Sequence, residues 1–158
     1  IIMCESMSSI FEGSNASRVA KEFSDRVWLS WTNRGHQPDQ LPSTEALSKA
    51  VDFSIEADVE CTLINCSHAD MASNSIKELK RSPRFGIFAN SSTFKEVDLS
   101  IATKDVDSIH HLNSEKISAK EYAMIALSWI KEGAFVVGGC CGTTVEHTRE
   151  IKLLMDSV

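Results

Sequence analysis

The sequence predicts an α/β fold in which parallel strands alternate with helices. Short apolar runs, rich in β-branched residues, alternate five times with amphipathic stretches along the chain. Continuously apolar strands of this kind are typical of parallel sheets that helices cover. At 158 residues the chain has the length of one domain, enough to bury a sizeable core. The pattern alone fits a doubly wound sheet and part of a (β/α)8 barrel equally well.

The first half of the chain contains two of these strand–helix units. The run IIMCE (1–5) predicts a strand, and a helix is expected over roughly residues 14–23. The run VWLSW (27–31) predicts the second strand. A polar loop then leads to Ser43, a residue type that favours helix N-caps, and to a helix with one apolar face that carries Ala46, Leu47, Ala50, Val51 and Ser54.

The middle of the chain contains the next two predicted strands. CTLINC (61–66) is followed by a predicted helix over roughly residues 70–81, and FGIFA (85–89) forms the fourth strand. The polar segment from Asn90 to Ile117 is interpreted as a long loop, a feature that is usually functional or mobile in a compact domain.

The strongest helix signal lies at residues 118–133, where Ser118 and Glu121 have the spacing of a capping box and Gly133 follows the last turn. The fifth strand, AFVV (134–137), runs directly into the motif GGCCGTT. A last helix is expected from about Thr144 to the end of the sequence.

Composition and charge exclude several classes of protein. The net charge is −6 and no cluster of Lys and Arg is present, which argues against a nucleic-acid or anionic-membrane partner. No apolar run approaches the length of a membrane span, and no signal peptide opens the chain, so a cytoplasmic location is expected. Five cysteines, unevenly spaced, favour metal ligation or thiol chemistry over a disulfide framework.

The candidate site residues follow the predicted strands. In both folds that fit the pattern, ligands bind at the carboxyl ends of parallel strands. Glu5, Cys66 and Asn90 end three strands, and Cys140 and Cys141 follow a fourth. We therefore expect these five residues to meet at one rim of the sheet.

Three thiolates at one rim predict a zinc site with Cys66, Cys140 and Cys141 as ligands. Neighbouring residues of a regular strand point to opposite faces, so both adjacent thiols reach one ion only where the backbone turns. The surrounding glycines permit that turn. Three protein ligands leave a fourth position for a substrate, and strong thiolate donation favours alkyl transfer to sulfur over hydrolysis.

Other polar residues have simpler interpretations beside the functional ones. Asn65 and Asn90 are equally consistent with turn residues. His68 is near enough to the rim to support the site, and His110–His111 could supply metal nitrogens, although a solvated pair fits a polar loop better. His147 is expected on the surface of the last helix. A redox dithiol of the adjacent cysteines is disfavoured, because their disulfide would close a strained ring.

Four stretches resemble the homocysteine S-methyltransferase family. GGCCGTTVEHTREI resembles its C-terminal motif, LINCSHAD its Asn-Cys motif, GIFANSS the segment that carries its asparagine, and CES its Glu-Thr or Glu-Ser at the end of barrel strand four. The resemblance implies a TIM barrel in which Cys66, Cys140 and Cys141 bind zinc and homocysteine binds as a thiolate. It also implies that Glu5 holds the homocysteine amino group and that Asn90 lies close to the substrate.

The implied function is zinc-dependent transfer of a methyl group from an onium donor to homocysteine, giving methionine. Relatives in the family use S-methylmethionine, S-adenosylmethionine, betaine or a methylated corrinoid as the methyl donor. No cobalamin-binding segment is seen in this sequence, which favours a small onium donor over the corrinoid. Residues 1–158 map onto strands four to eight, as a single homocysteine-binding-type domain without the first strands of the barrel. A missing segment or a partner is therefore expected to complete the barrel. The alternative is a non-catalytic truncated barrel that keeps the zinc site as a structural or partner-binding element.

Overall fold

A computed structural model describes residues 1–35, 37–94 and 114–157. Its main sheet has five parallel strands in the order β1-β2-β3-β4-β7, which confirms the predicted α/β architecture. The strands are β1 (Ile2–Met7), β2 (Val27–Trp31), β3 (Cys61–His68), β4 (Phe85–Asn90) and β7 (Val136–Gly139). Every predicted strand is present, and each lies within a few residues of its expected position.

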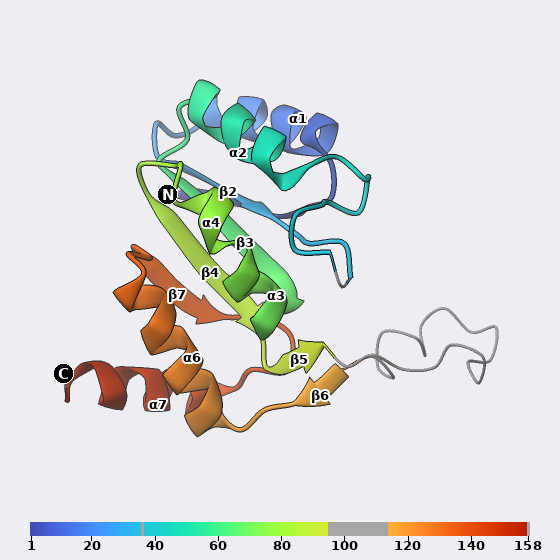
Figure 1. Cartoon of the computed structure of the whole chain (residues 1–158). Coiled ribbons are helices and arrows are strands. Elements are labelled where there is room, and N and C mark those ends of the chain that lie inside the picture. The colour runs from blue at the N-terminus through green and yellow to red at the C-terminus, as the bar shows by residue number, and fades with distance from the viewer. Residues whose placement is uncertain (36, 95–113, 158) are drawn as a thin grey trace, which may run out of the picture.

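Helices connect the strands and cover the sheet. They are α1 (Ile10–Lys21), α2 (Leu47–Glu56), α3 (Ala69–Asn74), α4 (Ile76–Leu79), α6 (Ala119–Lys131) and α7 (Val145–Met155). Figure 1 shows α1 and α2 beside the β1–β2 end of the sheet and α6 and α7 beside its β7 end, with α3 and α4 between them. None of the helices in the described ranges is long and apolar enough to cross a bilayer.

The core lies around the three central strands. β2, β3 and β4 are almost entirely buried, whereas the outer strands β1 and β7 are only half-buried. Trp31 at the end of β2 is fully buried, and its indole Nε1 donates to Ser54 Oγ of α2 at 3.0 Å. The continuous burial of β3 explains why its sequence shows no alternation of apolar and polar residues.

Two predictions about helices are wrong in detail. Ser43 does not cap α2, because its hydroxyl donates to Glu45 Oε2 at 2.6 Å and the helix begins only at Leu47. The expected helix over 70–81 is divided into α3 and α4 at Ser75. The Ser75 hydroxyl lies 2.9 Å from the carbonyl oxygen of Pro38 and 3.0 Å from that of Met71, so a side chain competes with the helical backbone there.

The segment predicted as a long loop contains a small antiparallel pair. β5 (Ser92–Phe94) pairs with β6 (Ser114–Lys116) in a separate two-stranded sheet. Residues 95–113, which include His110 and His111, lie outside the described residues. The capping box of α6 is confirmed: the backbone N of Glu121 donates to Ser118 Oγ, and the backbone N of Ser118 donates to Glu121 Oε2.

Candidate metal centre

Three sulfur atoms meet at the carboxyl end of the sheet. The Sγ atoms of Cys66, Cys140 and Cys141 all lie within 4.8 Å of one another, and those of Cys66 and Cys141 are 3.6 Å apart. Ligands about 2.3 Å from a tetrahedral zinc ion lie roughly 3.8 Å from one another. Both the thiol chemistry and the spacing of this cluster therefore fit a zinc ion.

Cys66 reaches the cluster through an unusual backbone conformation. Its φ is +53°, in the left-handed region that a residue with a side chain adopts at a cost of about 1–2 kcal/mol. The pairing of β3 with β4 shifts register between Asn65 and His68, so the strand bends where Cys66 lies. The left-handed residue turns the Cys66 side chain out of the regular alternation of β3.

Asn65 holds the backbone immediately before Cys66. Its buried side chain accepts hydrogen bonds from the backbone N of Ser6 at 3.0 Å and from Ser30 Oγ at 2.6 Å, and it donates to Ser6 Oγ at 2.7 Å. One amide thus connects β3, β2 and the end of β1. These bonds stabilise the bend at Cys66, so Asn65 has a supporting role at the rim.

The end of β4 holds the turn that carries Cys140 and Cys141. The backbone N of Cys140 donates to the carbonyl oxygen of Ala89 at 2.8 Å, and the backbone N of Ser91 donates to that of Cys141 at 3.0 Å. The backbone N of Cys141 donates to Asn90 Oδ1 at 3.0 Å. The Asn90 side chain therefore directly contacts the backbone of Cys141, one of the three predicted ligands.

Two glycines allow this turn. Gly142 has a φ of +77°, in the region that glycine adopts without strain. At Gly139, a Cβ atom would lie 2.6 Å from the Cβ of Thr143, closer than real atoms approach. The absence of both side chains lets the backbone fold back so that two adjacent thiols approach Cys66.

Burial keeps the Cys66 thiol protonated when no cation is near. The pKa of Cys66 is raised to about 12, first by burial and then by the neighbouring thiols of Cys141 and Cys140. A cation bound here would displace that proton, because metals bind the thiolate. Cys61 lies at the opposite end of β3 in the core, and Cys4 packs half-buried against the core from β1, so neither joins the cluster.

Glu5 lies on the same rim as an exposed carboxylate, two residues before the end of β1. The next residue, Ser6, has a φ of +61°, and β1 shifts register against β2 between Cys4 and Met7. The bond from Ser6 to Asn65 links this bend to the one at Cys66. Ser6 was not among the predicted residues, because nothing in its sequence neighbourhood indicated a left-handed residue inside an apolar strand.

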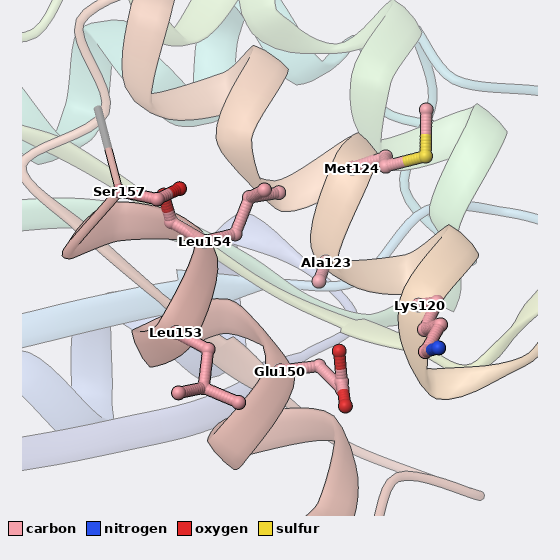
Figure 2. Close-up of a pocket in the computed structure, with 7 residues that line it drawn as sticks. All are labelled: Lys120, Ala123, Met124, Glu150, Leu153, Leu154 and Ser157. Atoms are coloured by element: carbon pink, nitrogen blue, oxygen red, sulfur yellow. The ribbon is translucent and has the colours of Figure 1, made fainter.

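A groove elsewhere on the surface has a different character. It lies between α6 and α7, has a volume of about 310 Å³, and is lined mainly by apolar groups from Ala123, Met124, Leu153 and Leu154 (Figure 2). Lys120 and Glu150 lie at one end of it (Figure 2). None of its lining residues is a predicted site residue, so it adds nothing to the chemistry of the rim.

Comparisons with known proteins agree with one another. Residues 1–155 match the family model described as homocysteine S-methyltransferase. The chain is 24% identical over 154 residues to homocysteine S-methyltransferase YbgG of Bacillus subtilis (strain 168), an alignment that covers 96% of this chain and 45% of YbgG.

Solved structures show the same fold. The apo form of the homocysteine methyltransferase MmuM from Escherichia coli superimposes with a TM-score of 0.68 and 18% identity, covering 97% of this chain and 49% of that one. Its metallated form gives a TM-score of 0.69 and 18% identity, covering 98% and 44%. The chain thus spans about half the length of the relatives it matches.

Proposed function

Because the chain belongs to the homocysteine S-methyltransferase family, we propose that it serves in methyl transfer to the sulfur of homocysteine, giving methionine. The observation that carries the proposal is the convergence of Cys66, Cys140 and Cys141 at the carboxyl ends of β3 and β7. In this proposal the three thiolates hold one zinc ion. A zinc ion bound there would keep the sulfur of homocysteine in its reactive thiolate form at neutral pH.

The residues of the rim have distinct roles in this proposal. The exposed Glu5 carboxylate binds the ammonium group of homocysteine and thereby fixes where its sulfur lies. Asn90 holds the backbone N of Cys141 and lies beside the substrate. Asn65 keeps the bends at Ser6 and Cys66 in register. Such positioning supplies a large part of the rate of a reaction between two bound molecules.

The chemical step is a direct displacement at the methyl carbon. The electron pair of the homocysteine sulfur forms the new S–CH₃ bond while the bond from methyl to the donor heteroatom breaks. That bonding pair stays on the donor, whose positive charge is neutralised. A small onium donor meets these requirements without a further cofactor.

The proposal includes three further strand–helix units that complete the barrel, from a longer chain or from a partner. The relatives are about twice as long as this chain, and β1 and β7 each lack a neighbour on one side among the described strands. Apolar side chains are exposed on the helices beside these two strands, with Phe11 of α1 78% and Val145 of α7 76% accessible. Strands and helices packed there would cover both.

Titration with homocysteine tests the proposal when it is done on the zinc-loaded protein whose barrel is completed by the longer chain or by the partner. We expect saturable binding with release of about one proton per homocysteine at pH 7, since a free thiol is protonated at that pH and binds as the thiolate. Calorimetry in two buffers of different ionisation enthalpy measures the released protons.

Two controls belong to this titration. Homoserine carries a hydroxyl in place of the thiol. It is expected neither to bind nor to cause release of a proton. The variant Glu5→Gln should weaken homocysteine binding while leaving the zinc content unchanged. If the zinc-loaded protein neither binds homocysteine nor releases protons, the methyl-transfer proposal is wrong, and the cluster is a structural or partner-binding element.

A further inference from the structure

A buried tyrosine joins the two strands that lead to the cysteine turn. The Tyr122 side chain of α6 is fully buried, and its hydroxyl lies 2.9 Å from the carbonyl oxygen of Ala89 and 2.7 Å from that of Gly138. Ala89 precedes Asn90 in β4. Gly138 belongs to β7 and lies two residues before Cys140. One hydroxyl therefore bridges the ends of both strands.

A histidine of the next helix continues this connection. The His147 ring of α7 packs edge-on against the Tyr122 ring, with 5.6 Å between centroids and an interplanar angle of 76°. The position predicted on the helix surface is thus half-buried instead, because α7 turns it toward α6. The backbone N of Thr144 donates to His147 Nδ1 at 3.1 Å.

That hydrogen bond determines the tautomer of His147. Because Nδ1 accepts from the backbone N of Thr144, the ring proton of neutral His147 resides on Nε2. Nε2 is buried and has no hydrogen-bond partner in the described part of the chain. The Thr144 hydroxyl also lies 3.0 Å from Nδ1, so contacts with Thr144 on one side and packing on Tyr122 on the other hold the imidazole in place.

Thr144 is the residue at which the cysteine turn ends and α7 begins. Within the turn, the backbone N and Oγ1 of Thr143 donate to the carbonyl oxygen of Cys140 at 3.2 and 2.7 Å. The turn is thus fixed at its start by Tyr122, through Gly138, and at its end by His147, through Thr144. The rings of Tyr122 and His147 touch behind it.

We infer that Tyr122 and His147 act as one unit that positions Cys140 and Cys141 for metal binding. The inference rests on the metal site of the proposed function. Neither residue touches the metal or substrate; each acts through the backbone of the turn. Mutation of residues that orient metal ligands typically lowers metal affinity by about 10- to 100-fold.

The test compares zinc affinity with metal-free stability in the full chain. Tyr122→Phe keeps the buried ring and removes the hydroxyl, and His147→Ala removes the acceptor for Thr144. Each is expected to weaken zinc binding by about 10- to 100-fold in competition with a chromophoric chelator. Unfolding by urea, measured with the metal removed, reports any general loss of stability separately from metal binding.

Two matched variants show whether such losses are specific. Ser54→Ala removes a buried hydrogen bond at Trp31, far along the sequence from the turn, and Ser9→Ala removes the N-cap of α1. Both should lower the free energy of unfolding of the metal-free protein about as much as Tyr122→Phe and His147→Ala do. Both should leave zinc affinity within about twofold of the wild type. His147→Gln should restore most of the affinity lost in His147→Ala, because glutamine at this helix position accepts from the capping residue.

Cobalt substitution and the double variant complete the test. The Co²⁺ absorption bands of Tyr122→Phe and His147→Ala should shift from those of the wild type, since the sulfur geometry changes. In Tyr122→Phe/His147→Ala the loss of affinity should be smaller than the product of the single losses, because the two residues act through one path.

The outcomes separate the two proposals. If the wild type binds metal and the two variants bind it equally tightly with unchanged Co²⁺ spectra, the inference about Tyr122 and His147 is overturned and the proposed metal site stands. The inference would also be overturned if the Ser54→Ala and Ser9→Ala controls lost as much zinc affinity as Tyr122→Phe and His147→Ala do. If the wild type binds no metal, both are wrong.

Discussion

Replacing Cys66 or Cys140 with serine is expected to abolish stoichiometric zinc binding. The two sulfurs come from β3 and from the turn after β7, and with Cys141 they form a cluster within 4.8 Å. Serine is close in size but is a poor zinc ligand, because its hydroxyl does not ionise near neutral pH as a metal-bound thiol does. The loss of zinc affinity should exceed the roughly 10- to 100-fold loss that typically follows mutation of residues that orient metal ligands. Metal analysis after dialysis against buffered zinc measures it.

Cys4→Ser is the matched control for these two variants. Cys4 is also a half-buried free thiol, but it lies in β1 and packs against the core outside the cluster. This variant should retain one zinc per chain, as is expected of the wild type. Zinc retained at full stoichiometry in Cys66→Ser would show that the ligands have been assigned wrongly.

Replacing Gly139 with alanine should disrupt the site without removing any ligand. The added Cβ would lie 2.4 Å from Thr143 Oγ1 and 2.6 Å from Thr143 Cβ, and rotation of the Thr143 side chain cannot move the latter. The turn must therefore shift, and overpacking of this kind costs about 1–3 kcal/mol. We expect the free energy of unfolding to fall by that amount and zinc affinity to drop by about 100-fold or more. Urea unfolding and chelator competition measure the two effects.

Gly35→Ala separates the effect of the clash from that of any glycine substitution. Gly35 has a φ of +52°, and a Cβ built on it meets nothing within 4 Å. Alanine there should cost about 1–2 kcal/mol of backbone strain and leave zinc affinity unchanged. If Gly139→Ala binds zinc as tightly as Gly35→Ala does, the close approach at Gly139 does not shape the metal site.

The gathering of the thiols was predictable from the sequence because it depends on a general property of parallel sheets. Cys66 follows one apolar strand, Cys140 follows another, and the carboxyl ends of parallel strands meet on one side. The glycines beside Cys140 indicated a turn, and the structure contains one. These are local patterns whose spatial consequence follows from topology alone.

The supports of the site depend on contacts that no local pattern encodes. The left-handed conformations of Ser6 and Cys66 occur in residue types that rarely adopt them, and Asn65 stabilises both across β2. Tyr122 and His147 meet only because α6 and α7 pack together. Ser43 was expected to cap a helix, but a carboxylate competed for its hydroxyl. In each case a tertiary hydrogen bond or packing contact decided the outcome.

X-ray absorption at the zinc edge tests most directly whether three thiolates share one ion with a place for a substrate sulfur. Such a site predicts three sulfur neighbours at about 2.3 Å in the zinc-loaded protein and a fourth after homocysteine is added. A first shell dominated by nitrogen or oxygen, or a sulfur count that homocysteine leaves unchanged, would contradict it.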